Sequence, residues 1–345
     1  MTPVFVFISG AALLVFSAEK LIGYLVDIAS GLRVSLFLLA VIFTGIEFDD
    51  IVLGVALNVE KLGNVALGIV FGTAVSMTGV VLALAAILAP TAVSIPRDYV
   101  AIFAAAPLVM IPFTLMAPLT PVHGVLLLAL FVVFIAYVAA RESRATTPVY
   151  RDAEMYEEFA AARRPGAGTT IVSTGPGGGD PPPPAIGRRS AWPRLGLAVL
   201  ALAGLVIGAA TTGIGTRGIL DTYRLSGTLF GATIATAVLT IEDIFLTVEP
   251  FRRGVPEIGV GNVIGSLVFS VTGKLGITLL AGRIVVTPDV LAWHLPVLIV
   301  MTGLAAYFMS TGRLRRWHGY ALLALYIAYW AVSFGLFGGP PVDLD

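Results

Sequence analysis

Charged residues are scarce in this chain, and cysteine is absent. Only 12% of its 345 residues are charged, against roughly a quarter in ordinary soluble domains, and 57% are hydrophobic. A chain this apolar cannot cover a water-facing surface with polar groups, so the lipid bilayer is its expected surroundings. The absence of cysteine excludes disulfides, thiolate metal sites and cysteine nucleophiles. The formal net charge of zero argues against nucleic acid as a partner.

Long apolar segments are plentiful, and ten of them suit the roughly 20 residues that cross a bilayer. Five precede a polar, arginine-containing stretch, at 3–18, 34–57, 65–90, 98–117 and 121–140. Five follow it, at 194–213, 226–250, 257–281, 288–309 and 318–338. The sequence therefore predicts an all-α membrane protein with ten transmembrane helices. Its parts would be a first half at 1–140, a linker at 141–193 that is disordered where it is rich in Gly and Pro, and a second half at 194–345.

The distribution of Lys and Arg predicts the orientation. If the N-terminus lies outside, most basic residues fall inside, and only Lys61, Arg217, Arg224 and Arg283 fall outside. We therefore expect a multi-pass protein of the cell membrane with both termini outside and the linker in the cytoplasm. Because five spans are an odd number, the second half would enter the membrane from the opposite side to the first.

A repeat links the two halves. The acidic pair Asp49-Asp50 is followed by Ile, as is the pair Glu242-Asp243, and each pair lies within an apolar segment. A Gly-x-x-x-Gly motif and a small hydroxyl residue follow each pair. One offset of 193 residues aligns Asp50 with Asp243, Gly68 with Gly261 and Gly72 with Gly265. The ten helices are therefore predicted to form two inverted five-helix repeats, an architecture of secondary transporters. The glycines would also let helices approach closely.

Five carboxylates lie near the middles of the two acidic spans: Glu47, Asp49, Asp50, Glu242 and Asp243. Each costs about 2.5–3.5 kcal/mol to insert, so such residues tend to be functional. Symmetry matches Asp50 with Asp243 and Asp49 with Glu242. The alternative is structural: one carboxylate pairs with Lys274, and others are protonated or lie at the end of a span.

Oxygen ligands favour a hard cation such as Ca²⁺, Mg²⁺, Mn²⁺ or Na⁺. Four hydroxyls could complete a shell around the carboxylates: Thr73, Thr240, Ser266 and Ser270. Each of them could instead bond back to its own helix. The spacing of Ser266, Ser270 and Lys274 places them on one helix face, which we expect to look toward the acids. Lys274 would be either a fixed counter-ion that fills a cation position or a titrating group that couples protons.

At these motifs the chain resembles the calcium/cation antiporter superfamily, of the sodium/calcium exchanger type. The resemblance covers both membrane halves, and Gly261 to Ser266 is the closest stretch. It implies ten helices, inverted repeats and a cytoplasmic loop after the fifth helix. It also implies that Asp50 and Asp243 stand at the ion-binding glutamates of the family, and Thr73 and Ser266 at its ligand serines.

The chain departs from the family pattern around these positions. Asp49 and Glu242 stand where the family has proline, and Lys274 has no counterpart in the usual motif. The family's Thr-Ser pair is replaced by Ile46-Glu47 in the first repeat and by Leu239-Thr240 in the second. Met77 and Ser270 stand where the family has a second amide or acid.

The predicted function is secondary active antiport of Ca²⁺ or another hard cation against Na⁺ or H⁺ by alternating access. The alternative is a cation sensor or membrane scaffold that has the exchanger fold but does not transport. An enzyme is not expected, since no metalloprotease motif appears and no histidine lies among the acids. No cofactor is expected beside the transported cations. The partners would be the bilayer and inorganic cations, and the sequence leaves a homo-oligomer open.

Overall fold

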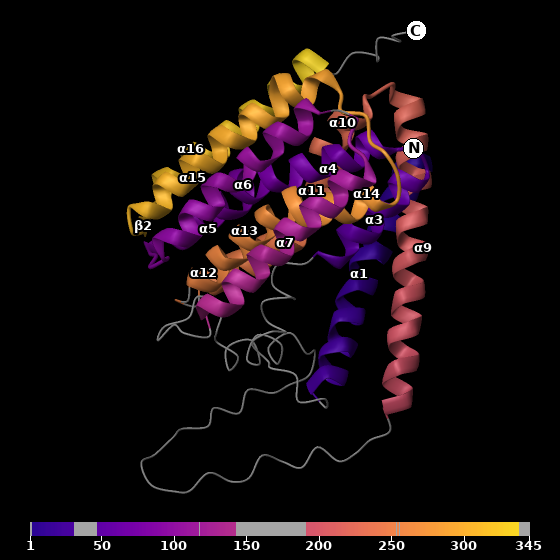
Figure 1. Ribbon diagram of the computed structural model, residues 1–345, viewed down its shortest axis with the longest axis horizontal. Coiled ribbons are helices and arrows are strands. Elements are labelled where there is room, and N and C mark those ends of the chain that lie inside the picture. The colour runs from indigo at the N-terminus through magenta and orange to yellow at the C-terminus, as the bar shows by residue number, and fades with distance from the viewer. Residues whose placement is uncertain are drawn as a thin grey trace, which may run out of the picture.

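The computed structural model is mostly helical (Figure 1). It describes residues 2–30, 47–116, 118–142, 191–252, 254 and 256–337. Most of the linker expected at 141–193 and the first part of the span expected at 34–57 lie outside the described residues, so the structure leaves those predictions as they stand.

The described part of the first half contains six α-helices, of which the first is the longest. The elements are α1 (Thr2–Ser30), α3 (Phe48–Val59), α4 (Gly63–Ser76), the π-helical segment η1 (Met77–Leu82), α5 (Ala83–Leu88), strand β1 (Thr91–Ala92), α6 (Arg97–Leu115) and α7 (Pro121–Glu142). Because η1 continues α4 into α5, these three elements form one apolar span, Gly63–Leu88.

The second half contains counterparts of the first-half helices, with its strand placed later in the order. Its elements are α9 (Ala191–Tyr223), α10 (Gly227–Phe230), the π-helical segment η2 (Gly231–Ala235), α11 (Thr236–Leu239), α12 (Ile241–Arg252), α13 (Pro256–Phe269), η3 (Ser270–Lys274), α14 (Leu275–Leu280), η4 (Val290–His294), α15 (Leu295–Ser310), strand β2 (Arg313–Leu314) and α16 (Arg316–Phe337). Here α13, η3 and α14 form the span Pro256–Leu280.

The described part of the chain holds eight helices that are long and apolar enough to cross a membrane. A ninth is added if Gly227–Leu239 and Ile241–Arg252, which meet at an angle of 50°, count as one broken span. These nine lie at nine of the ten segments expected from hydropathy. A mostly helical membrane protein is therefore confirmed, although the segment predicted as one span at 226–250 is bent in its middle.

Several elements of the two halves begin at one shared distance in sequence. Three element starts and their counterparts are each separated by 193 residues: Phe48 and Ile241, Gly63 and Pro256, Met77 and Ser270. This is the offset that aligns the sequence motifs. Even the π-helical segments η1 and η3 correspond, so the repeat extends from residue types to local backbone geometry.

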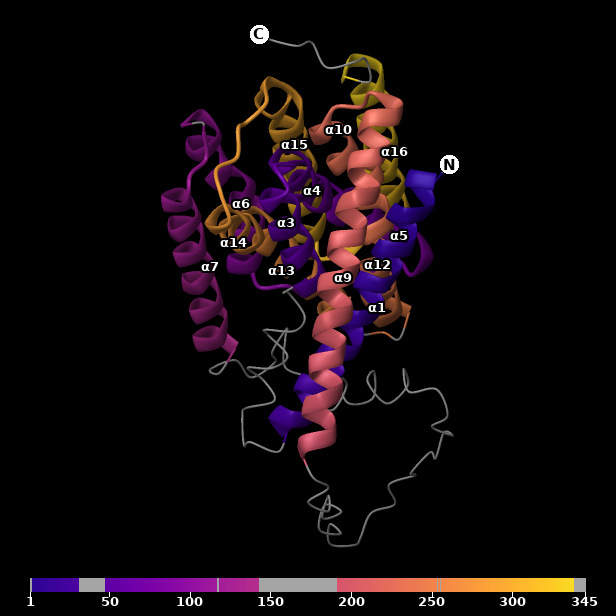
Figure 2. The ribbon, with the colours of Figure 1, turned by 90° about the vertical axis from the view of Figure 1, so that its right-hand side faces the viewer.

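Two spans form the centre of the molecule, and the others surround them. In the windows that qualify them as spans, Gly63–Leu88 and Pro256–Leu280 have 94% and 89% of their residues buried, against 22–44% for the other six spans. Helices α1 and α9 lie side by side along one edge in both views (Figures 1 and 2). In a bilayer, the apolar outer faces of the surrounding helices would meet lipid.

The central span of the first half approaches the broken span of the second half very closely. A Cβ on Gly68 would lie 2.3 Å from the backbone oxygen of Thr228, and one on Gly72 would lie 2.2 Å from Oγ1 of Thr236. Only glycine permits this separation, so the close helix packing predicted for this Gly-x-x-x-Gly motif is confirmed.

Short strand pairings join the halves at the helix ends, which an all-α expectation did not include. Strand β1 pairs antiparallel with β2, with Thr91 opposite Leu314, and Leu119 pairs with Ile284. The segments after α5 and α14 thus pair crosswise with the segments before α16 and α7. These pairings satisfy backbone N–H and C=O groups that lie outside the helices.

The two ends of the described chain lie on the same side of the molecule, and the helix ends that flank residues 143–190 lie on the other side. In both views the start of α1 and the end of α16 lie toward one end of the molecule, whereas the end of α7 and the start of α9 lie toward the other (Figures 1 and 2).

Candidate functional site

The acidic pairs lie where helices begin in the middle of the molecule. Glu47 precedes α3 in an extended conformation, with φ −81° and ψ 92°, and Asp49 and Asp50 occupy the first turn of α3. Thr240 marks the 50° bend between α11 and α12, and Glu242 and Asp243 occupy the first turn of α12. A helix N-terminus presents free N–H groups and a positive dipole end, which stabilise carboxylates there.

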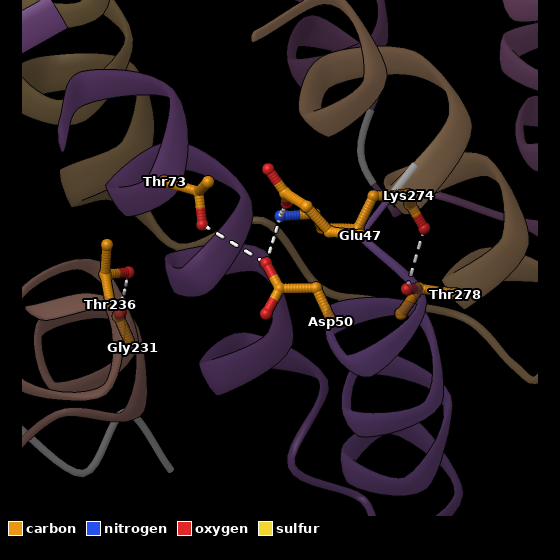
Figure 3. A network of polar contacts seen from close by, with 7 residues as sticks. All are labelled: Glu47, Asp50, Thr73, Gly231, Thr236, Lys274 and Thr278. Carbon is orange, nitrogen blue, oxygen red and sulfur yellow. Dashed lines mark hydrogen bonds and ion pairs between the residues drawn. The ribbon is translucent and has the colours of Figure 1, made fainter. Parts of the chain in front are cut away.

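Lys274 joins the acids of the first half. Its Nζ lies 2.5 Å from Oε2 of Glu47 and donates a hydrogen bond to Oδ2 of Asp50. Figure 3 shows the lysine reaching from the second half to these two carboxylates. Lys274 is 1% exposed and Asp50 is 4% exposed, so the ion pair is almost fully removed from solvent.

Thr73 completes the contacts of Asp50. Its Oγ1 donates a hydrogen bond of 3.5 Å to the same Oδ2 that accepts from Lys274 (Figure 3). The predicted hydroxyl of the first half therefore lies at the predicted carboxylate. Oδ1 of Asp50 makes no hydrogen bond within the described structure, so one oxygen of this carboxylate is engaged and the other is left over.

The counterpart residues of the second half are also buried. Asp243, Thr240, Ser266 and Ser270 are all buried, and the charges of Glu47, Asp49, Asp50 and Glu242 all act on Asp243. The structure thus brings the five carboxylates into one electrostatic neighbourhood. Asp49 and Glu242 are half-buried, as is Glu47, whereas Asp50 and Asp243 are buried.

Several buried oxygens here have no hydrogen-bond partner among the described residues: Oε1 of Glu47, Oδ1 of Asp50, Oγ1 of Thr240 and Oγ of Ser270. Leaving such a group unsatisfied costs about 1–3 kcal/mol, and native proteins rarely tolerate it without a role. All four belong to residues predicted as ligands from sequence. Unsatisfied oxygens beside an excess of negative charge suit a cation or its water shell.

The acids do not form a ready metal cage with one another. Across the part of the chain that the structure describes, no group of three or more Asp, Glu, His or Cys side chains is placed to hold a metal ion. The two carboxylates that come together do so around the ammonium of Lys274. A cation bound here would use few carboxylates together with hydroxyl oxygens.

Two residues that support Lys274 were not singled out from sequence. Thr278 donates to the backbone oxygen of Lys274 at 2.8 Å (Figure 3), and Asn58 donates to the backbone oxygen of Thr278 at 2.8 Å and to that of Gly282 at 3.1 Å. Asn58 thereby ties the end of α3 to α14. A buried amide within the otherwise apolar run from Ile51 to Val59 is the signal that could have identified Asn58.

Comparison with known protein families identifies the family of this chain. The model of the sodium/calcium exchanger protein family matches residues 2–140 and 194–335. This chain belongs to the sodium/calcium exchanger family. The two matched segments contain both acidic pairs and Lys274, and the stretch between them, 141–193, is the one that the sequence predicts as a linker.

Individual relatives match part of the chain. It is 30% identical over 137 residues to the sodium/calcium exchanger MaX1 of Methanosarcina acetivorans, covering 39% of each chain. It is 26% identical over 138 residues to an uncharacterized membrane protein of Methanocaldococcus jannaschii, covering 38% of this chain and 42% of that one. The aligned segments thus span about two fifths of the length of each relative.

Solved structures share the exchanger fold over nearly the whole chain. The sodium-calcium exchanger NCX_Mj soaked with 10 mM Na⁺ and zero Ca²⁺ superposes with a TM-score of 0.57 at 19% identity, covering 95% of this chain and 98% of that one. The same protein soaked with 2.5 mM Na⁺ and 0.1 mM Ca²⁺ gives a TM-score of 0.55 at 20% identity, with 96% and 98% covered. At these identities the likeness establishes the fold.

Proposed function

We propose that this protein is a secondary active cation antiporter that exchanges Ca²⁺ or another hard cation for Na⁺ or H⁺ by alternating access. The observation that carries the proposal is a pair of helix N-termini, one in each half, that each hold an acidic pair with a buried aspartate, together with buried oxygens that lack partners in the described structure. Family membership supports the same function. No enzymatic step and no cofactor are needed for it.

The proposed architecture is ten transmembrane helices in two inverted five-helix repeats, at 1–140 and 194–345, with a linker at 141–193. The recurrence of element starts at 193 residues supports it. In the cell membrane both termini would lie outside and the linker in the cytoplasm, as the arginine distribution favours. Inverted repeats of this kind alternate the access to a central site by moving one bundle against the other.

The proposed cation ligands are oxygens from both halves. The inner ones come from Asp50, Asp243, Glu47, Thr240 and Ser270, since these are buried or carry unsatisfied oxygens. Thr73 and Ser266 lie beside them as buried hydroxyls, whereas Asp49 and Glu242 would attract cations from the half-buried rim. All of these are hard oxygen donors, which favour Ca²⁺, Mg²⁺, Mn²⁺ or Na⁺ over softer metals.

Flux measurements in proteoliposomes test the proposal. ⁴⁵Ca²⁺ uptake would be followed under an imposed Na⁺ gradient and then under a pH gradient, for the wild type and for the double variant Asp50→Asn/Asp243→Asn. Asp98→Asn is a matched control, because Asp98 pairs with Arg141 at an exposed helix end. We expect gradient-driven uptake that the double variant loses and the control keeps.

The alternative, a sensor or scaffold without transport, predicts a different result. Purified protein would then bind Ca²⁺ through Asp50 and Asp243, yet correctly inserted protein would carry no Ca²⁺, Mn²⁺ or Mg²⁺ under either gradient. That outcome would reject antiport and retain the cation site.

A further inference from the structure

A short hairpin joins the two membrane spans that contain α15 and α16. The spans Val290–Ser310 and Arg316–Leu336 are separated only by residues 311–315, which include strand β2. Because an extended residue covers at most about 3.6 Å, so short a segment cannot carry the chain far from the point where the two helices leave the hydrocarbon core. Figure 1 shows β2 at the end of α15 and α16 that is remote from the C-terminus. Residues 311–316, here called the arginine hairpin, therefore lie at the depth of the lipid headgroups.

Hydrogen bonds fix the shape of the arginine hairpin. Gly312 has a φ of 73°, in the left-handed region that glycine adopts without strain. Oγ1 of Thr311 lies 2.7 Å from the backbone oxygen of Phe308 and 3.1 Å from that of Arg313, and it donates to both. The backbone oxygen of Gly312 accepts a hydrogen bond of 3.0 Å from the N–H of Val93, beside the pairing of β2 with β1. A ligand would therefore meet a surface that is already ordered, which lowers the entropic cost of binding.

Three arginines project from this ordered surface. Arg313, Arg315 and Arg316 are exposed, whereas Leu314 is fully buried between them. Because side chains alternate along an extended strand, Arg313 lies on the side opposite to the buried leucine, and Arg315 follows on that same side. Arg316 is the first residue of α16. Three guanidinium groups are therefore displayed within four consecutive residues.

The three positive charges have no acidic partner among the residues that the structure describes. By contrast, two exposed arginines elsewhere are paired: Arg141 lies 3.0 Å from Asp98, and Arg217 lies 3.6 Å from Glu60. The hairpin thus keeps an uncompensated positive charge that attracts anions. A guanidinium group offers its N–H donors in a planar fork that matches phosphate oxygens, so an anionic phosphate fits this surface.

Aromatic side chains flank the arginines on both helices. Tyr307 of α15 is 63% exposed, and Trp317 and Tyr320 of α16 are 55% and 57% exposed. Trp and Tyr are enriched where lipid headgroups meet the hydrocarbon core. The ring of Trp317 packs edge-on against Phe308, with the ring centroids 5.2 Å apart. A phosphate bound beside these rings could carry a glycerol group and acyl chains that they contact, which favours a lipid over a free phosphate ion.

We propose that the arginine hairpin binds the headgroup of an anionic phospholipid from the leaflet that it faces. The guanidinium groups would bind the phosphate oxygens, and Trp317 would pack against the glycerol region. A zwitterionic headgroup carries a positive charge of its own and would gain less from the arginines. Because β2 pairs with β1, which follows the central span Gly63–Leu88, the bound lipid would also stabilise the junction between the two halves. This inference concerns how the fold is held in the membrane and does not rest on antiport.

Lipid binding to the purified full chain in detergent tests the inference. Native mass spectrometry would count the bound lipids while phosphatidylglycerol or phosphatidylcholine is titrated. The test variant Arg313→Gln/Arg315→Gln/Arg316→Gln removes the three charges of the hairpin.

A matched control removes three exposed basic residues near the start of α4, which is the end of the span Gly63–Leu88 remote from β1. The control variant is Lys61→Gln/Arg224→Gln/Arg283→Gln. Both triple variants therefore change the net charge by the same amount, at opposite ends of the membrane helices.

For the wild type and the control variant we expect phosphatidylglycerol to bind more tightly than phosphatidylcholine. The test variant should lose about a hundredfold in phosphatidylglycerol affinity, because each basic residue near an anionic surface contributes roughly fivefold. Its affinity for phosphatidylcholine should stay unchanged. Phosphatidylglycerol should also raise the unfolding temperature of the wild type more than that of the test variant, since a ligand stabilises the state that binds it.

Equal affinity of the wild type for the two lipids would overturn the inference. A preference for phosphatidylglycerol that survives in the test variant, or that the control variant loses to the same extent, would overturn it too. Displacement of phosphatidylglycerol by inorganic phosphate would identify a site for a free anion and overturn the lipid assignment. If the test variant is not recovered folded, the three single variants decide. Each should lose about fivefold in phosphatidylglycerol affinity, and three unchanged affinities overturn the inference.

Discussion

Nζ of Lys274 lies 2.5 Å from Oε2 of Glu47, although the two residues belong to different halves of the chain. Glu47 is the last residue before α3, and Lys274 is the last residue of η3. The same contact therefore joins two elements of the fold and neutralises part of the acidic centre. A residue with both tasks links the stability of the protein to the occupancy of its ion site.

Removal of this lysine should make stability depend on divalent cations. Lys274→Met leaves two buried carboxylates without their counter-ion, which costs about 3–5 kcal/mol in comparable buried pairs. Ca²⁺ binding to the vacated position should recover part of that loss. The unfolding temperature in detergent, with EGTA and with Ca²⁺, measures both effects. An unchanged unfolding temperature in EGTA would contradict the structural task of the ion pair, provided that Lys20→Met also behaves as the wild type.

Hydroxyl groups within η3 should separate ion binding from stability. Ser270 has a buried oxygen without a partner, so Ser270→Ala should leave the unfolding temperature unchanged and weaken Ca²⁺ binding by about tenfold, near 1.4 kcal/mol. Thr272, two residues away, donates to the carbonyl of Val268. Thr272→Val should lose about 1 kcal/mol of stability and keep its affinity. Calorimetric Ca²⁺ titration and thermal unfolding of both variants would reveal the opposite pattern if the assignment is wrong.

The internal repeat could be predicted from the sequence because the same residue types recur at corresponding positions of the two halves. The offset of 193 between Asp50 and Asp243 is also the offset between the starts of α3 and α12 and between η1 and η3. Hydropathy placed the spans for the same reason, since a bilayer requires long apolar runs. The expectation that Lys274 faces the acids followed from the cost of exposing it to lipid, and its contacts with Glu47 and Asp50 confirm it.

The bend at Thr240 and the π-helical segments could not be predicted from the sequence. Neither Gly nor Pro marks the bend at Thr240, and the apolar segment at 226–250 therefore predicted one span without a break at that residue. The π-helical segments likewise carry no composition of their own, because packing between helices creates them. Symmetry matched Asp49 with Glu242, yet the carboxylates that converge on Lys274 are Glu47 and Asp50. Glu47 lies just outside α3, so a pairing rule based on residue type could not anticipate its position.

Asp289, an acid just before the observed span Val290–Ser310, should give a pH-dependent contribution to stability. Asp289 precedes η4, and its Oδ2 lies 3.6 Å from Nε2 of His294. Burial raises the pKa of Asp289, but the favourable interactions of its carboxylate with His294 and Thr287 outweigh this effect, so the pKa falls below the ordinary value of 3.8. A lowered carboxyl pKa stabilises the folded state above pH 3.8, and this contribution is lost as the pH falls through the folded pKa.

Asp289→Asn should therefore unfold at a lower temperature than the wild type at pH 7, and the difference should be smaller at pH 3, below the ordinary carboxyl pKa of 3.8. Thermal unfolding in detergent at the two pH values measures it. Asp221→Asn, at an exposed position of α9, is the control and should match the wild type at both. A difference that grows on acidification would show that the sign of the assigned interaction is wrong.

The close approach of the two halves should make Gly68 sensitive to a single methyl group. A Cβ at this position would lie 2.3 Å from the backbone oxygen of Thr228, and backbone cannot move aside as a flexible side chain does. Gly68→Ala should therefore separate α4 from α10 and η2 at a cost of about 1–3 kcal/mol. Because α4 also carries Thr73, Ca²⁺ affinity should fall together with the unfolding temperature. Gly303→Ala on α15 meets no atom within 4 Å and should leave both unchanged or raise stability slightly, since alanine favours a helix over glycine. Equal behaviour of the two alanine variants would mean that the halves are not packed as closely as the structure has them.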